Sequence, residues 1–194
     1  MTTSPLNALA ARLESVEALD VPGRAAGRTI RALIGDGAPK EALSGAWLGH
    51  AVHPILTDIP IGTWTSAVLL DWTGGQGSAS ASDRLILAGV LAAGATFATG
   101  WSDYADAEQR SPAVRRSGLV HAAANASATA LMIGSLLARR RGARGRGKLL
   151  TLAGSAALGA GGWLGGHLSY TLGAGVTAGA PAAGAQATAT AGTA

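Results

Sequence analysis

Four long apolar segments follow one another along most of the chain. They cover approximately residues 53–72, 84–101, 118–138 and 149–172. Each is close to the roughly 20 residues that an α-helix needs to cross the hydrocarbon layer of a bilayer. Two stretches, 85–102 and 117–138, contain no Asp, Glu, Lys or Arg, whereas soluble helices of this length carry a charged face. The pattern predicts an all-α fold, an integral membrane four-helix bundle.

The first segment contains residues that are unusual inside a membrane helix. Pro54 suits a helix start, while Pro60 removes a backbone hydrogen bond and is expected to kink the helix. Asp58 lies between them. A buried acid is costly, so Asp58 is a candidate functional residue. It could be the partner of a histidine, a proton-relay carboxylate, or a partner for backbone groups freed at the kink.

The residues before these segments have an amphipathic helical pattern. Ser4-Pro5 suits the start of a first helix, and Val21-Pro22-Gly23 is expected to break it. A second short helix is expected to carry apolar residues on one side and basic residues on the other, namely Ile30, Leu33 and Ile34 against Arg24, Arg28 and Arg31. Such helices lie on membrane surfaces or pack as ordinary cytosolic hairpins, and the sequence leaves both open.

Three regions follow from this pattern. Residues 1–45 form an amphipathic N-terminal extension, and residues 46–175 form the four-helix transmembrane domain. Residues 176–194 consist mainly of Ala, Gly and Thr and have no charge. Because such a composition offers few bulky side chains to bury, we expect a disordered tail.

Composition supports the membrane assignment and narrows the chemistry. Hydrophobic residues make up 48% of the chain and charged residues 13%, about half the charged share of an average soluble domain. The 29 glycines lie largely in or beside apolar runs, as in closely packed membrane helices. The absence of Cys excludes thiol catalysis and thiolate-bound iron–sulfur clusters within this chain. No hydrolase or transferase motif is present, so we do not expect an enzyme by itself.

The basic residues concentrate in the stretch RRRGARGRGK at residues 139–148. Since this run joins two apolar segments, it is typical of a cytoplasmic loop beside anionic membrane lipid and not of a nucleic-acid site. Placing that loop inside, however, requires export of the polar N-terminal region. The membrane orientation therefore stays open. The sequence is compatible with a homo-oligomer.

All four histidines lie where apolar segments meet polar ones. If four helices cross up and down, the topology brings His50, His53, His121 and His167 to one membrane face. At about 1.5 Å per residue, the last three lie at similar depth on three helices. A b-type haem in a helical bundle needs two axial imidazoles and neighbouring small residues. We therefore expect His53, His121 and His167 to bind haem b, with Asp58, Asn125 and Ser169 orienting their rings.

A metal ion is the competing interpretation of the same residues. Its ligands would come from His50, His53, His121 and His167, with Asp58 as a further donor. Neutral imidazoles together with a carboxylate suit zinc, iron or copper better than calcium. His50 precedes the helix and is the weakest member of the set.

Four blocks resemble a known bacterial family. They are WLGHAVHPILTDIPIGTWTSAVLLD, ATGWSDY, RRSGLVHAAAN and GGWLGGHLSYTLG, spread over residues 46–175. The family consists of predicted membrane domains of unknown function that are frequently fused to a C-terminal Rieske iron–sulfur domain. The resemblance implies a bacterial plasma membrane and an electron-transfer setting with a Rieske or other redox partner. This chain has no Cys-x-His motif after the resemblance.

Together these observations predict a multi-pass membrane protein that binds haem or a metal ion as a subunit in electron transfer. Two alternatives remain. The first is a structural or scaffold membrane protein without a cofactor, whose histidines only satisfy interfacial hydrogen bonds. The second is a small transporter or proton path that uses Asp58 and the histidines as relay groups.

Overall fold

The computed structural model describes residues 4–175, and these residues fold into helices without a strand. Three shorter helices come first: α1 (Pro5–Glu14), α2 (Asp20–Ile34) and α3 (Ala38–Ser44). Four longer helices follow: α4 (His53–Thr73), α5 (Ala79–Ala107), α6 (Pro112–Arg140) and α7 (Arg144–Gly166). A π-helical turn, His167–Thr171, continues α7. The all-α prediction is thus confirmed, and the tail expected at 176–194 lies outside the described residues.

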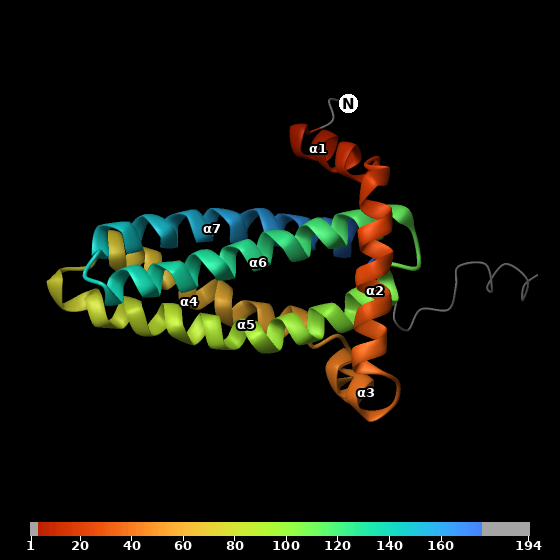
Figure 1. Ribbon diagram of the computed structural model, residues 1–194, viewed down its shortest axis with the longest axis horizontal. Coiled ribbons are helices and arrows are strands. Elements are labelled where there is room, and N and C mark those ends of the chain that lie inside the picture. Colours follow the sequence, from red (N-terminus) through yellow and green to blue (C-terminus); the bar gives the residue numbers. More distant parts are fainter. Residues whose placement is uncertain (1–3, 176–194) are drawn as a thin grey trace, which may run out of the picture.

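The four longer helices lie alongside one another, and α2 crosses one end of them (Figure 1). Helix α4 packs mainly on α5, and α6 packs mainly on α7. The contacts between α5 and α6 and between α4 and α7 are fewer. The arrangement therefore consists of two helical pairs, α4–α5 and α6–α7, that face each other.

The apolar segments predicted the four long helices, but their ends differ. Helix α6 begins earlier than expected because Pro112 occupies its first turn and the Ser111 hydroxyl accepts a hydrogen bond from the Val114 amide at 3.2 Å. These are ordinary signals of a helix start. The break expected at Val21-Pro22-Gly23 is wrong, because these residues lie in the first turn of α2, where proline has no intrahelical bond to lose.

Helix α4 continues through Pro60. Because proline has no N–H, the carbonyl four residues earlier, that of Leu56, loses its intrahelical donor. The Thr96 hydroxyl of α5 donates to this carbonyl at 3.2 Å. Thr96 therefore meets the group that Pro60 frees, and Asp58, which we considered for that role, is exposed on the outside of α4.

Small side chains make up most of the interior of the four helices, together with Trp64, Ile86 and Met132, while many large apolar side chains face outward. The buried set is dominated by Ala, Gly, Ser and Thr, including Ala67, Gly89, Ala93, Ala128, Ser135, Thr151 and Gly154. Leu91 and Leu149 are 71% and 60% exposed. A soluble helical bundle has the opposite distribution, whereas small residues at helix contacts and large apolar ones outside are typical of membrane proteins.

Two of the described helices, α5 and α6, are long and apolar enough to cross a membrane. Only 28% and 17% of their most apolar windows are buried within the protein. They are therefore not enclosed like the core helix of a soluble protein. Membrane crossing by α4 and α7 stays a prediction.

Candidate functional site

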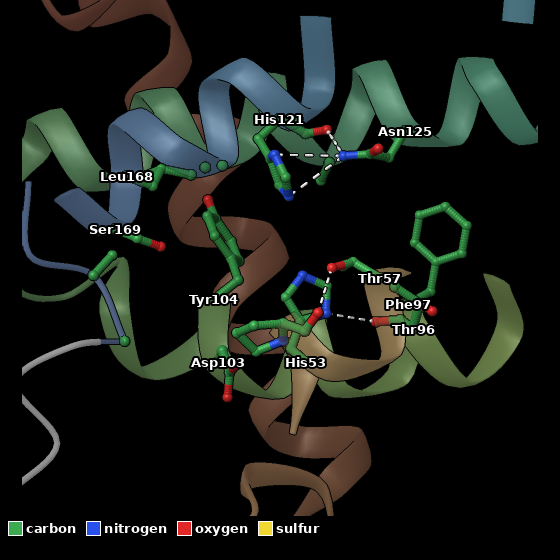
Figure 2. Close-up of a pocket in the computed structure, with 18 of the residues that line it drawn as sticks. His53, Thr57, Thr96, Phe97, Asp103, Tyr104, His121, Asn125, Leu168 and Ser169 are labelled. Atoms are coloured by element: carbon green, nitrogen blue, oxygen red, sulfur yellow. Dashed lines mark hydrogen bonds between the residues drawn. The ribbon is translucent and has the colours of Figure 1, made fainter. Parts of the chain in front are cut away.

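A cavity of about 460 Å³ opens between the two helical pairs. Residues from all four long helices line it, and Tyr104 places it near the end that α2 crosses, since the Tyr104 hydroxyl donates to the Gly23 carbonyl of α2 at 3.2 Å. Most of the lining is apolar or glycine. Figure 2 shows two of the few polar side chains, His53 and His121, converging from opposite sides.

The first residue of α4, His53, is oriented by α5. Its Nδ1 lies 3.0 Å from the Thr96 carbonyl oxygen and 3.3 Å from the Thr99 hydroxyl. A carbonyl oxygen can only accept, so the Nδ1 of a neutral His53 ring carries the proton in this contact. The lone pair of the neutral ring is then on Nε2, the atom that such imidazoles offer to a metal.

His121 is oriented in the same manner, by α7. Its Nδ1 donates to the Gly161 carbonyl at 2.8 Å. The Asn125 amide donates to the His121 carbonyl at 2.9 Å and lies 3.4 Å from both ring nitrogens. The expectation that Asn125 accompanies His121 on one helix face thus describes their positions correctly, and the neutral ring again has its lone pair on Nε2.

The two rings are close to each other and nearly perpendicular. Their centroids are 6.4 Å apart and their planes make an angle of 84°. In Figure 2 the Nε2 edges of His53 and His121 point toward each other across the cavity. The two neutral imidazoles thus present their Nε2 atoms to one space, and the amide nitrogen of Asn125 lies 3.4 Å from that of His121.

Glycines make room for both rings. A Cβ atom at Gly100 of α5 would come within 2.7 Å of the His53 ring, and one at Gly165 of α7 within 3.0 Å of the His121 ring. Real Cβ atoms do not approach side chains this closely, so any larger residue at Gly100 would displace the ring. These two glycines position the imidazoles.

The other two histidines lie elsewhere. His50 is exposed, and its Nδ1 is 3.3 Å from the Ala51 carbonyl. His167 stacks on Trp163 and its Nε2 lies 2.6 Å from a carboxylate oxygen of Glu14 in α1. Across residues 4–175, no group of three or more His, Cys, Asp or Glu side chains is arranged to hold a metal ion. The expected group of three or four histidines is therefore not formed.

Only some of the residues predicted to orient the histidine rings lie at the cavity. Asn125 and Ser169 line the cavity. Asp58 does not, although its neighbour Thr57 does, because the Asp58 side chain lies on the outer surface of α4. Asp58 is therefore not placed to orient a histidine ring at the cavity.

Sequence reasoning missed the groups that orient the rings. They are main-chain carbonyls of Thr96 and Gly161, and a carbonyl leaves no side-chain signature. The local signal that exists is a glycine four residues later in each case, at Gly100 and Gly165, because the next turn of the same helix must leave space for the ring.

A buried charge cluster lies at the opposite end of the same four helices. Arg139 donates to both carboxylate oxygens of Asp71, and both side chains are 1% exposed. A second contact joins Arg139 to Asp83 at 2.9 Å. Arg84 is the basic residue nearest to Asp71 along the chain, but it is exposed, and the cation that Asp71 binds comes from the basic run at 139–148. Arg139 is therefore an internal residue and not a lipid-facing charge.

Comparison with known proteins supplies the family. No curated protein and no solved structure matches the chain. Residues 49–178, which include all four long helices and both cavity histidines, match a family described as "Predicted membrane protein (DUF2231)". This confirms the resemblance found in the sequence, and the chain belongs to the DUF2231 family of predicted membrane proteins.

Proposed function

We propose that the chain is a multi-pass protein of the bacterial plasma membrane in which α4–α7 cross the bilayer as a four-helix bundle and bind haem b between His53 and His121. The outward-facing leucines and the small buried residues of the four helices support the membrane placement. The observation that carries the cofactor proposal is the pair of facing imidazoles, each with its Nδ1 held by a main-chain carbonyl.

The separation of the rings fits two ligands on opposite sides of one metal. Two metal–imidazole bonds of about 2 Å each, together with the radii of the two rings, account for a centroid distance near the observed 6.4 Å. His53 and His121, one from each helical pair, would therefore hold the metal of the group.

The number of protein ligands favours haem over a bare metal ion. Protein-bound zinc takes three or four side-chain ligands, while the described residues bring only two imidazoles together at this site. A porphyrin supplies its own four nitrogens and needs only axial ligands from the protein. The cavity, about 460 Å³ and mostly apolar, is within the size range of cofactor sites.

The chain's own residues would hold the group and set its surroundings. The carbonyls of Thr96 and Gly161 fix ring orientation and tautomer, and the apolar lining keeps water from the space between the rings. Haem b bound in this way supplies reversible one-electron transfer. The proposed role is that of a membrane subunit that exchanges single electrons with a redox partner protein.

An absorption spectrum of the purified protein tests the proposal. The full chain is produced in bacterial membranes with a haem precursor in the medium, extracted in mild detergent, and measured before and after reduction with dithionite. We expect a Soret band that shifts on reduction, one haem per chain, and loss of the band in both His53→Ala and His121→Ala. His50→Ala and His167→Ala are the matched controls and are expected to retain it.

Elemental analysis of the same samples separates the alternatives. One zinc or copper per chain without a Soret band, lost in His53→Ala and His121→Ala, would replace haem by a metal ion. A colourless protein that binds neither haem nor metal, and whose stability does not change in those two variants, would overturn the cofactor proposal and favour a structural role.

A further inference from the structure

Helices α5 and α7, the second helices of the two pairs, share a sequence pattern. Residues 85–95 read LILAGVLAAGA and residues 150–160 read LTLAGSAALGA, so leucines, alanines and glycines recur at a spacing of 65 residues. Gly100 and Gly165, which make room for the two imidazoles, have the same spacing. The match extends to burial. Buried, half-buried and exposed positions alternate in the same order from 79 to 92 as from 144 to 157.

Helices α4 and α6, the first helices of the two pairs, are alike in which positions are buried more than in which residues occupy them. With the spacing of 68 residues that separates His53 from His121, each of the four buried residues of α4 coincides with a buried residue of α6. These pairs are Pro60 and Ala128, Trp64 and Met132, Ala67 and Ser135, and Asp71 and Arg139. The spacings of 68 and 65 differ by three residues: the α4–α5 connection is two residues longer than the α6–α7 connection, and α6 ends one residue earlier relative to its histidine than α4 does.

Contacts within the pairs correspond as well. A Cβ atom added at Gly89 would collide with Trp64, and one added at the equivalent Gly154 would come within 3.1 Å of Met132, the counterpart of Trp64. His53 bonds the Thr96 carbonyl, and His121 bonds that of the equivalent Gly161. The correspondence therefore includes the side chains that form the site and not only the path of the backbone.

Contacts between the pairs also occur twice. Arg139 binds the Asp83 carboxylate, and the Lys148 ammonium donates to the Asp71 carbonyl. Exchanging each residue for its counterpart converts the first contact into the second, because Arg139 corresponds to Asp71 and Asp83 to Lys148. A rotation that exchanges the two pairs thus restores the same neighbours.

We infer that α4–α5 and α6–α7 are two copies of one helical hairpin related by a two-fold axis along the bundle, and that the histidine site lies on this axis. Each copy supplies one imidazole, one carbonyl that orients it and one glycine that makes room for it. The ligand this site fits has two equivalent faces and is flat, as a metal macrocycle is. This last step rests on the proposed function, whereas the repeat does not.

Charged residues at equivalent positions of the two copies explain why the first copy pairs with the second and not with another first copy. At equivalent positions the first copy carries Asp71 and Asp83, and the second carries Arg139 and Lys148. Two first copies facing each other would bring like charges together at a buried contact, and so would two second copies. Opposite charges at equivalent positions therefore select the pairing of unlike copies, as charge patterns do in other helical assemblies.

Exchanging the charges between the copies tests the two-fold relationship. All variants are made in full-length protein carrying Arg144→Ala, because Arg144 corresponds to the uncharged Ala79. The half exchange, Asp71→Arg with Asp83→Lys, places only basic residues at the contact, and we expect a loss of about 10 °C in melting temperature or of monodisperse protein. The full exchange adds Arg139→Asp and Lys148→Asp and is expected to recover more than half of that loss. A full exchange that is no more stable or monodisperse than the half exchange would overturn the repeat.

Titration with haemin tests the equivalence of the two faces. His53→Gly and His121→Gly should lose affinity to the same extent, within about twofold, and added imidazole should restore binding equally in both, because it refills equivalent spaces. A variant that loses its histidine at no cost to affinity would contradict equivalent ligation. If the unsubstituted protein binds no haemin, the proposed function and the ligand step fail, and the charge exchange still decides the repeat.

Discussion

His53 and His121 face each other from different helical pairs, with ring centroids 6.4 Å apart and ring planes at 84°. The shortest hydrogen bond of each ring is to the neighbouring helix of its pair. His53 is bonded to α5 and His121 to α7. These hydrogen bonds join helices of the same pair, so the orientation of each ring does not depend on how the two pairs pack against each other. The distance between the two rings does depend on that packing, because the rings belong to different pairs.

The first prediction concerns the space that Gly100 leaves for His53. Gly100→Leu should push the ring out of line and lower haemin affinity by about tenfold or more, since a loss of about 1.4 kcal/mol has that effect. Gly94→Leu on the same helix is the matched control, because a Cβ atom there meets nothing within 4 Å. Both variants are measured by haemin titration and thermal melting. Equal affinities in the two variants would contradict the positioning role of Gly100.

The second prediction concerns the buried ion pair. Arg139→Met leaves Asp71 buried without its cation, a change that typically costs about 3–5 kcal/mol and should lower the melting temperature by about 10 °C. The neighbouring Arg140 is exposed, and Arg140→Met should change the melting temperature by no more than about 2 °C. Thermal melting of both variants in detergent checks the difference. If the two lose the same stability, the Arg139–Asp71 contact is not what holds this end of the helices.

The sequence predicted the long helices well, because uncharged stretches such as 117–138 are a local property of the chain, although the prediction overlooked the helix-start signal at Ser111-Pro112. The sequence also predicted that His53 and His121 lie at the same level of the helices, and their ring centroids are 6.4 Å apart. Depth, however, is only one of the two coordinates that place a side chain on a helix. Gly165 faces His121, and a residue two positions later is turned by about 200° around an α-helix. His167 therefore points to Glu14 and away from the cavity.

Long-range pairing was the other property that the sequence did not reveal. Asp71 lies two residues before the end of α4 and Arg139 one residue before the end of α6, and several more basic residues follow Arg139. Which of them reaches Asp71 depends on the packing of α4 against α6 and α7, which local patterns do not encode. The repeat of residues 85–95 at 150–160 was present in the sequence and would have indicated that α5 and α7 occupy equivalent places.

The third prediction concerns the contact between α2 and the end of α5. A Cβ atom at Gly27 would come within 2.5 Å of the Glu108 carboxylate, which is fixed by Arg31 at 3.0 Å and Arg115 at 2.9 Å. Gly27→Val should therefore separate α2 from the bundle and increase protease cleavage between α1 and α2 several-fold. The exposed Thr29→Val on the same helix is the control. Unchanged cleavage in Gly27→Val would mean that α2 is held by other contacts.

The fourth prediction concerns acid stability at the same end. Hydrogen bonds from Arg116, and secondarily from Arg115, lower the pKa of Asp20 from 3.8 to about 2. Because the folded pKa is below the unfolded value, the stabilising effect of Asp20 is complete above about pH 4 and is lost as the pH falls toward about 2. Docking of α2 should weaken across this window. Asp20→Asn lacks the titrating group, so the contribution of this position should be absent at every pH.

Pepsin digestion measures how firmly α2 is docked, because the protease is active between pH 4 and pH 2 and the exposed connection between α1 and α2 is its target. Cleavage rates are divided by those of an unfolded peptide of the same sequence to remove the pH dependence of pepsin itself. Asp20→Asn should be cleaved faster than the unsubstituted protein at about pH 4, and the two rates should converge near pH 2. Other carboxylates at this end, such as Glu108, are present in both proteins, so their contributions cancel in the comparison. A constant ratio of the two rates from pH 4 to pH 2 would show that the Asp20 carboxylate does not hold α2 against Arg115 and Arg116.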